Sequence, residues 1–288
     1  MKIYDRCKKE YIETEQYGQG KLEFLYGNPF GRILLKIVVS PFTSKIYGKY
    51  NSLPASAKKI PEFVDKYNIR LDEFEKTKYN SFNDFFTRKR KPDKMNIDKN
   101  IDTLISPADS KLLVYDITDE LKVFIKGSTY TLNELVRDKT DISDYKGGIC
   151  LVFRLCMDDY HRYCFIDKGR LLKSYYIKGK LHTVSSISKE YKIFKENTRI
   201  VSICDTENFA QIVQIEVGAL LVGRIVNYEI TTFSKGEEKG YFEPGGSTIV
   251  LLLKKNTAQI DSDILQQSGN GTETIVKYGE RIGKKINA

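Results

Sequence analysis

Two glycines and a serine stand directly before a strongly apolar run. The segment Gly245-Gly246-Ser247 leads into residues 248–253, which are almost wholly aliphatic. Glycine permits unusual backbone torsions and leaves the carbonyl group of Gly246 unshielded. The hydroxyl oxygen of Ser247 is therefore placed to attack that carbonyl carbon and to move the acyl group from nitrogen to oxygen. Spacing alone favours a simpler alternative, a turn that leads into a strand.

A serine hydroxyl is a weak nucleophile unless a base lies beside it. The chain has two histidines, His161 and His182, so a histidine-rich metal site is excluded. Its five cysteines form no close pair of the kind that zinc sites use. Phosphate-binding glycine loops and the His-Glu-x-x-His motif are also absent. We therefore predict no metal site. The serine and its neighbours remain as the candidate catalytic residues.

The elements that must position this chemistry begin after about residue 101, where the chain changes character. Strand-like apolar runs cover residues 111–115, 148–153, 212–217 and 248–253. Turns rich in glycine and aspartate separate them, and one short helix is expected at 132–137. Many short strands with little helix between them favour an antiparallel core over a wound α/β sheet. We predict an α+β fold with a β-rich catalytic core over residues 93–288.

Residues 1–92 form the predicted N-terminal helical region, in which the polar residues 1–20 are expected to be a mobile arm or an edge strand. Apolar residues at near-helical spacing between positions 22 and 38 face away from basic ones, and Pro41 ends this helix. A second helix is expected over 55–67, broken at Pro61. A basic amphipathic region of this kind can associate with a membrane interface. Packing against the rest of the protein explains the pattern equally well.

The composition is that of a globular protein with a basic surface. Of 288 residues 41% are hydrophobic, and Lys and Arg exceed Asp and Glu by 47 to 38. This excess favours a polyanionic partner, either an anionic membrane or nucleic acid. We expect no signal peptide and no membrane span, because the apolar run at residues 33–39 is far shorter than roughly 20 residues. The unpaired cysteines predict reduced thiols in a cytoplasmic protein.

Four segments, taken together, resemble the phosphatidylserine decarboxylase family. They are Phe85-Phe86-Thr87-Arg88, Pro107-Ala108-Asp109, Asp159-Tyr160-His161-Arg162 and Gly245-Gly246-Ser247-Thr248. Each segment is short, but they occur in the order that the family shows. The chain is thus similar to the prokaryotic type of proenzyme in this family.

The resemblance implies that the chain cuts itself between Gly246 and Ser247. An acyl shift and β-elimination would separate a long β chain (1–246) from a short α chain (247–288), and loss of ammonia would turn Ser247 into a pyruvoyl group. This pyruvate-derived cofactor would form a Schiff base with phosphatidylserine and accept the electrons freed as CO₂ leaves. The product would be phosphatidylethanolamine, and no external cofactor is implied.

The resemblance also implies roles for Asp109 and His161. In the family an aspartate of the Pro-Ala-Asp segment and a histidine near Asp-Tyr-His-Arg serve with the serine, so we expect Asp109, His161 and Ser247 to act together. Many members carry a second histidine three residues later, where this chain has Cys164. We expect His161 to be the cleavage base and later the proton donor. Cys164 and His182 are candidate pocket residues.

Membrane contact is predicted at Phe85, Phe86, Arg88 and Lys89. The two cations would lie at a lipid phosphate and the rings among acyl chains, although a solvated charge run is the alternative. The resemblance implies a protein that is peripheral on the cytoplasmic face of the cell membrane. It also implies a homodimer of cleaved protomers that acts on phosphatidylserine in an anionic membrane.

Two other functions stay open at this point. A pyruvoyl decarboxylase of a soluble amino acid would use the same chemistry, but it needs no basic amphipathic region. A non-catalytic basic protein that binds anionic lipid or nucleic acid would leave the chain whole. Nucleic acid is disfavoured as a partner because no known binding module is present and the aromatic residues do not interleave with the basic run.

Overall fold

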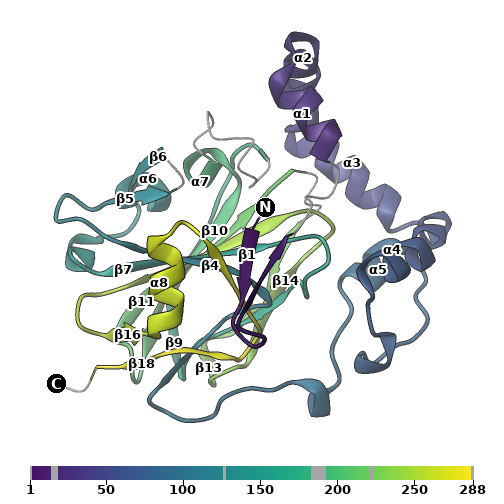
Figure 1. The fold of residues 1–288 in the computed structure, drawn as a ribbon. Helices are drawn as coiled ribbons and strands as arrows, with labels where there is room; N and C mark the ends of the chain where they lie inside the picture. Colours follow the sequence, from purple (N-terminus) through teal and green to yellow (C-terminus); the bar gives the residue numbers. More distant parts are fainter. Residues whose placement is uncertain (1, 14–18, 126–127, 183–192, 221–223, 287–288) are drawn as a thin grey trace.

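A large sheet forms the body of the protein, and a helical projection extends from one end of it (Figure 1). The computed structural model describes residues 2–13, 19–125, 128–182, 193–220 and 224–286. The predicted α+β fold is confirmed, with the longer helices in the N-terminal part and an antiparallel-rich sheet in the core.

The main sheet has ten strands in the order β13-β9-β10-β11-β15-β7-β4-β17-β1-β2. Along the chain these are β1 (Lys2–Asp5), β2 (Glu10–Glu13), β4 (Ser110–Asp116), β7 (Ile149–Leu155), β9 (Gly169–Ile177), β10 (Arg199–Thr206), β11 (Gln211–Gly218), β13 (Thr232–Phe233), β15 (Ser247–Leu253) and β17 (Glu273–Val276). Neighbouring strands are antiparallel except for β1 and β17, which are parallel. The four runs predicted as strands are β4, β7, β11 and β15.

Smaller elements surround this sheet. Two three-stranded sheets contain β12 (Ile225–Asn227), β14 (Glu238–Phe242) and β8 (Arg162–Cys164), and β16 (Ala258–Ile260), β18 (Arg281–Lys285) and β3 (Thr103–Ile105). The remaining pieces are the hairpin of β5 (Lys122–Ile125) and β6 (Ser128–Thr131) and the helices α6 (Leu132–Val136), α7 (Ile193–Glu196) and α8 (Ser262–Gly269). The short helix expected at 132–137 is α6.

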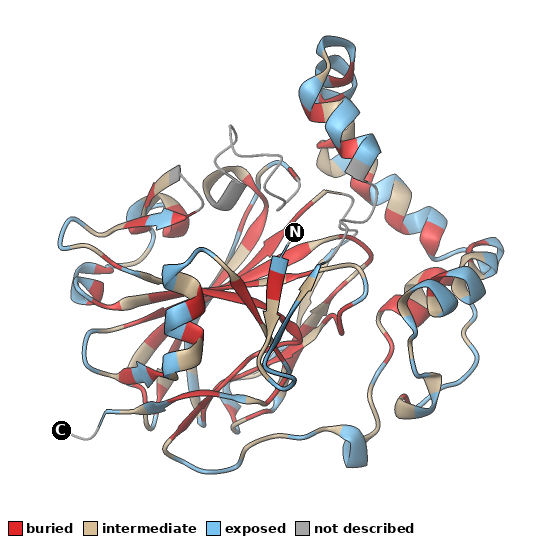
Figure 2. Cartoon of the chain, in the orientation of Figure 1, coloured by how far each residue is buried: buried red, intermediate tan, exposed pale blue. Residues whose placement is uncertain are grey.

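Both faces of the main sheet are buried at its centre, as the red strands of Figure 2 show. All seven residues of β15 are buried. Because successive side chains of a strand point to opposite faces, Ile249 and Leu251 join one core cluster, whereas Val250 and Leu252 join the other. The aliphatic run that follows Ser247 is therefore the middle of a sheet that is covered on both sides.

The projection consists of α1 (Gln19–Gly27), α2 (Pro29–Val38) and α3 (Pro41–Asn51), followed by α4 (Ile60–Tyr67) and α5 (Phe82–Phe86) nearer the body. The single helix expected over 22–38 is two helices. Asn28 caps α2, since its side chain accepts a hydrogen bond from the amide of Phe30, and Pro29 begins the new helix without needing an amide hydrogen. Pro61 likewise lies in the first turn of α4 rather than at a break within a helix.

The region 1–92 is not helical throughout, because residues 2–13 form the β1–β2 hairpin of the main sheet. Each strand has only four residues, and Ile3 alone among them is buried, so no alternating pattern marks them in the sequence. The division of the chain near residue 92 remains a prediction. None of the described helices is long and apolar enough to cross a bilayer.

Candidate active site

Ser247 is the first residue of β15, the central strand between β11 and β7. Its neighbours across the sheet are Gly218 and Leu155, and its side chain is fully buried. The turn before it contains Gly245 with a φ of 144°, a value that residues with a side chain rarely adopt. A glycine-dependent turn therefore delivers the peptide between Gly246 and Ser247 into the protein interior.

His161 lies beside this serine and is oriented as a base. Its Nδ1 is 3.3 Å from Ser247 Oγ, and its Nε2 is 2.7 Å from the carbonyl oxygen of Cys156. A carbonyl oxygen only accepts hydrogen bonds, so Nε2 carries the ring hydrogen. In the neutral ring Nδ1 is then free of hydrogen and accepts the bond from the Ser247 hydroxyl. The predicted nucleophile and base are thus brought together in the geometry that proton transfer requires.

The surroundings of His161 keep its ring neutral. Burial lowers the pKa of His161 to about 4, and the carboxylate of Asp159 opposes this shift only in part. The ring of Phe86 packs on the imidazole with centroids 4.2 Å apart. A ring that is neutral near pH 7 is able to accept the proton of a serine hydroxyl.

Asp109 does not contact this pair. Its carboxylate accepts a bond from Arg90 Nη2 at 3.0 Å and one from the amide of Tyr278 at 2.8 Å. Burial opposes its ionisation, but the neighbouring cations and these hydrogen bonds hold the pKa of Asp109 below its ordinary value. Among the described residues no hydrogen bond joins Asp109 to His161 or Ser247. The carbonyl of Cys156 occupies the position in which we expected this carboxylate.

A buried ion pair supports that carbonyl, and neither of its members was among the predicted site residues. Lys111 Nζ is 2.8 and 2.7 Å from the two carboxylate oxygens of Asp159. One of these oxygens also accepts the amide hydrogen of Cys156 at 2.7 Å, which closes the turn that follows β7. Lys111, Asp159 and the Cys156 backbone therefore form a chain of contacts that ends on His161. Asp159 stands in a recognised segment, but nothing in the sequence pairs it with Lys111.

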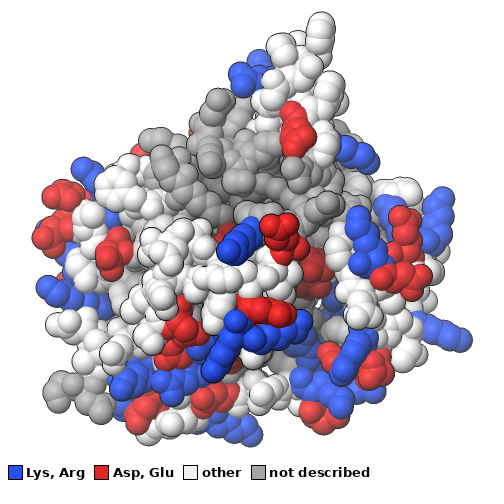
Figure 3. Space-filling model, in the orientation of Figure 1, with Lys and Arg blue, Asp and Glu red and all other residues white. Residues whose placement is uncertain are grey.

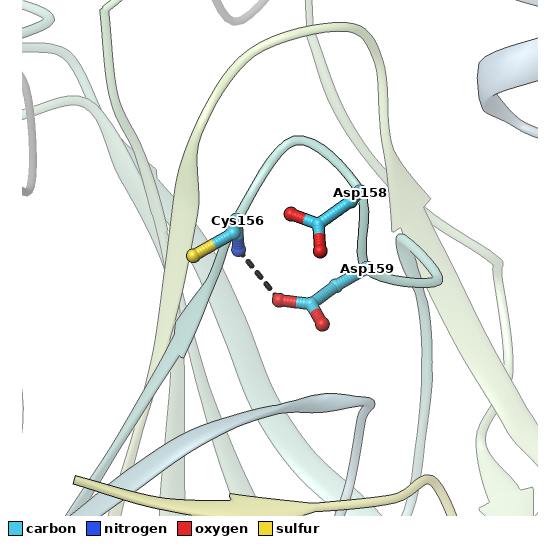
Figure 4. A group of neighbouring side chains, drawn as sticks. All are labelled: Cys156, Asp158 and Asp159. Carbon is cyan, nitrogen blue, oxygen red and sulfur yellow. Dashed lines mark hydrogen bonds between the residues drawn. The ribbon is translucent and has the colours of Figure 1, made fainter. Parts of the chain in front are cut away.

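The same turn contains a cluster of possible metal ligands, shown in Figure 4. Single ligand atoms of Cys156, Asp158 and Asp159 lie within 4.8 Å of one another. Two cations of the chain already face this cluster, since Lys111 bonds both oxygens of Asp159 and Arg154 Nη1 is 2.8 Å from the Cys156 sulfur. We therefore assign no metal to it.

The two candidate pocket residues lie apart from the serine. Cys164 is buried with its sulfur 3.9 Å from the carbonyl oxygen of Ser106, and burial raises the pKa of its thiol above the ordinary value. His182 packs where the projection meets the body, with its Nδ1 3.4 Å from the hydroxyl of Tyr26 in α1. Neither side chain forms a described hydrogen bond with Ser247 or His161.

The prediction of lipid contact was wrong for Phe85, Phe86 and Arg88, because all three are buried. The two rings belong to an aromatic cluster that also holds Phe63 and Phe82. Of the four predicted residues only Lys89 is exposed, with 54% of its side chain accessible. Phe86 therefore packs against His161, and Phe85 packs within the aromatic cluster, instead of against a bilayer.

A different surface carries exposed apolar side chains. It lies on α1–α3 and the turn after α3, where Figure 3 shows a mostly uncharged projection with Lys and Arg at its margins. Residues 19–59 contain seven Lys and Arg but one acidic residue, Glu23. The exposed large apolar side chains here are Phe24, Phe30, Ile33, Leu34, Ile37, Phe42, Ile46, Tyr50 and Leu53. We call this set the apolar surface of α1–α3.

The family model and three relatives that match this chain all carry the name phosphatidylserine decarboxylase. The family model described as phosphatidylserine decarboxylase matches residues 82–284. The chain is 51% identical over 284 residues to a protein of Clostridium acetobutylicum named phosphatidylserine decarboxylase proenzyme 2, and the match covers 98% of both chains. It is 43% identical to the phosphatidylserine decarboxylase proenzyme of Clostridium botulinum, with 99% of both chains covered, and 42% identical to that of Desulfitobacterium hafniense, with 98% of both covered.

We expect the ring of His161 to titrate near pH 4 in the folded protein, because burial lowers its pKa to about 4. An unfolded histidine titrates near 6.5, so this residue stabilises the fold fully above about pH 6.5. That contribution is lost as the pH falls from about 6.5 toward about 4. NMR titration of the histidine ring signals of the Ser247→Ala chain measures the midpoint, and the His182→Gln change assigns the signals. A midpoint near 6.5 for His161 would contradict the buried neutral ring.

Proposed function

The chain belongs to the phosphatidylserine decarboxylase family, and on that premise we propose that it makes its catalytic carbonyl group by cutting itself between Gly246 and Ser247. It is a decarboxylase that converts phosphatidylserine to phosphatidylethanolamine. The observation that carries the proposal is the 3.3 Å approach of Ser247 Oγ to His161 Nδ1, directly after the turn at Gly245.

The first step uses groups that this chain holds in place. His161 Nδ1 takes the proton of the Ser247 hydroxyl while Oγ bonds to the carbonyl carbon of Gly246. The bond from that carbon to the Ser247 nitrogen breaks, and the nitrogen receives the proton from His161. An ester now joins Gly246 to the side chain of residue 247. The chain of contacts from Lys111 through Asp159 and Cys156 supports this step because it fixes which ring nitrogen faces the serine.

Elimination then separates the two chains. Loss of the Cα proton of residue 247 and rupture of its Cβ–Oγ bond release Gly246 as a carboxylate and leave a Cα–Cβ double bond. Proton return to Cβ and addition of one water at Cα expel one ammonia and leave a ketone. We assign the proton transfers to His161, since it is the base beside residue 247 among the described residues.

The pyruvoyl group formed in this way supplies an electrophilic carbonyl that takes up the electron pair when the substrate carboxylate leaves as CO₂. The burial of Ser247 supports this role because it limits the access of bulk water to the carbonyl. We assign to His161 the return of a proton to the decarboxylated carbon. His161 is assigned this role because it is the titratable side chain beside residue 247 among the described residues.

We further propose that the apolar surface of α1–α3 docks on an anionic membrane. Exposed rings next to an excess of cations match a bilayer in which acyl chains lie beneath phosphate groups. The phospholipid substrate supports a peripheral position, and we place it on the cytoplasmic face. The names of the relatives support this substrate over a soluble amino acid. The expected homodimer of cleaved protomers rests on the family resemblance.

The central test is intact-mass measurement of the purified protein under denaturing conditions. We expect the wild type to give two chains, the shorter spanning residues 247–288 with a pyruvoyl group at its start. Ser247→Ala should stay whole because it lacks the attacking oxygen. His161→Gln should cleave at least about 100-fold more slowly because general-base assistance is lost. His182→Gln is the matched control and should cleave normally, and a whole wild-type chain after incubation with anionic vesicles would contradict the proposal.

A second prediction compares two neighbouring aspartates. Asp159→Asn should slow self-cleavage about tenfold or more, because the Cys156 turn that orients His161 loses its charged support. Asp158→Asn, an exposed change in the same turn, should leave the rate unaltered. Rates come from intact mass against time, and urea unfolding in the Ser247→Ala background shows whether Asp159→Asn still folds. Equal rates in the two variants would rule out the support assigned to Asp159.

Membrane docking predicts that Phe30 and Phe42 carry binding energy, since 78% and 71% of these residues are exposed. The double change Phe30→Ser, Phe42→Ser should weaken sedimentation with anionic vesicles by at least about tenfold, because each ring buries apolar area worth roughly 1.5–3 kcal/mol. Phe124→Ser is the control, because Phe124 is 59% exposed on β5 of the body. If both variants bind vesicles as the wild type does, the docking surface is elsewhere.

A further inference from the structure

The β1–β2 hairpin lies against the segment that would become the short chain. β1 pairs in parallel with β17, from Ile3 opposite Glu273 to Asp5 opposite Ile275. β2 pairs within the main sheet with β1 alone. In the sheet order the hairpin therefore covers β17, which would otherwise be an edge strand with unpaired backbone groups (Figure 1).

Arg6, directly after β1, is the main polar link. Its Nε is 2.9 Å from Asp263, its Nη2 is 3.1 Å from Asp261, and its Nη1 is 3.3 Å from Glu280. The carbonyl oxygen of Arg281 accepts a further bond at 2.6 Å, and only 14% of the Arg6 side chain is exposed. Arg6 thus ties the start of α8 to the turn between β17 and β18, two parts of the same short segment.

The other polar contacts of the hairpin also lie in the C-terminal segment. The Tyr11 hydroxyl is 3.2 Å from the Gln267 side chain in α8. Within the described part of the chain, each hydrogen bond and ion pair that leaves residues 2–13 ends between residues 261 and 281. Among the described residues, the polar contacts of the hairpin with other elements therefore all lie in the C-terminal segment.

Self-cleavage changes what these contacts do. Before it they join distant parts of one chain, and after it Arg6 lies on the long chain while Asp261, Asp263 and Glu280 lie on the short one. The short chain has 42 residues (288 − 247 + 1), a size that rarely supports an independent core. Loss of Arg6 would also leave Asp263 and Glu280 without this cation, whereas Asp261 keeps its ion pair with Arg281.

We infer that the β1–β2 hairpin is a clamp that retains the short chain once the peptide before Ser247 is cut. The inference rests on the proposed self-cleavage. β15 anchors the front of the short chain in the middle of the sheet, between β11 and β7. The clamp covers the outer edge of its rear, where β17 lies between β1 of the clamp and β4. The turn that Glu280 caps also carries Tyr278, whose amide donates a hydrogen bond to Asp109 of the long chain.

The experiment compares Arg6→Gln with Arg70→Gln, which removes a surface cation that pairs with Glu73 in the helical region and does not contact the short chain. Each full-length protein is allowed to cleave, and intact mass under denaturing conditions records the extent. Each is then passed through a sizing column in a series of urea concentrations below the unfolding transition. The short chain that remains with the long chain is measured in the protein peak.

We expect Arg6→Gln to cleave as the wild type does but to lose its short chain about tenfold faster, which corresponds to ~1.4 kcal/mol. Arg70→Gln should match the wild type. Tyr11→Phe, which removes a single hydrogen bond, should give a smaller increase in the same direction. In the Ser247→Ala background the same changes should release nothing, because the segment stays covalently attached.

The possible outcomes distinguish failure of the clamp proposal from failure of the self-cleavage proposal on which it rests. Two masses with equal retention in Arg6→Gln and the wild type would overturn the clamp and leave self-cleavage intact. A single 288-residue mass in the wild type would overturn self-cleavage, and the clamp with it. Failure of Arg6→Gln to cleave would also overturn the clamp, since the hairpin would then be needed to build the site rather than to retain its product.

Discussion

The position at which β15 begins is the constraint on which the rest of the site depends. Its first residue, Ser247, must stay in register with β11 and β7 while the turn at Gly245 brings in the preceding peptide. β7 ends beside the serine, so the turn that follows places the Cys156 carbonyl against His161. A shift of β15 by one residue would turn the serine to the opposite face of the sheet, away from the imidazole.

Several buried charged side chains of this interior form ion pairs with one another, and none of these pairs includes His161. Lys111 with Asp159, Arg154 with Glu273, and Lys239 with Glu216 are ion pairs whose members are largely buried. A lone buried charge is costly, whereas these pairs are satisfied by each other and by further hydrogen bonds. His161 is held instead by a backbone carbonyl and an aromatic ring, and its burial favours the neutral form of its ring. The arrangement explains how a histidine keeps an unprotonated nitrogen without a direct carboxylate partner.

Much of the fold and of the candidate site was predictable from the sequence, for reasons that differ from residue to residue. The aliphatic strands are evident from their side chains, and the recognised segments locate Ser247 and His161. The pairing of Lys111 with Asp159 depends on which strands become neighbours, which local sequence does not encode. Aromatic residues such as Phe86 fit a lipid interface and a buried cluster equally well, so burial alone decided between them. For the β1–β2 hairpin the sequence left two alternatives, a mobile arm or an edge strand, because its short strands bury almost nothing by themselves.

The residues of the site are far apart in the sequence, so the site can form only after the chain has folded. The serine, its base and the carbonyl that orients the base come from residues 247, 161 and 156, and they meet once β7 and β15 have paired. Contacts so far apart in the chain form late, after the sheet has closed. On the proposed mechanism, an unfolded or newly made chain would therefore not react at this peptide. Self-cleavage would start only after folding is complete, so a cut chain would show that its core had once assembled correctly.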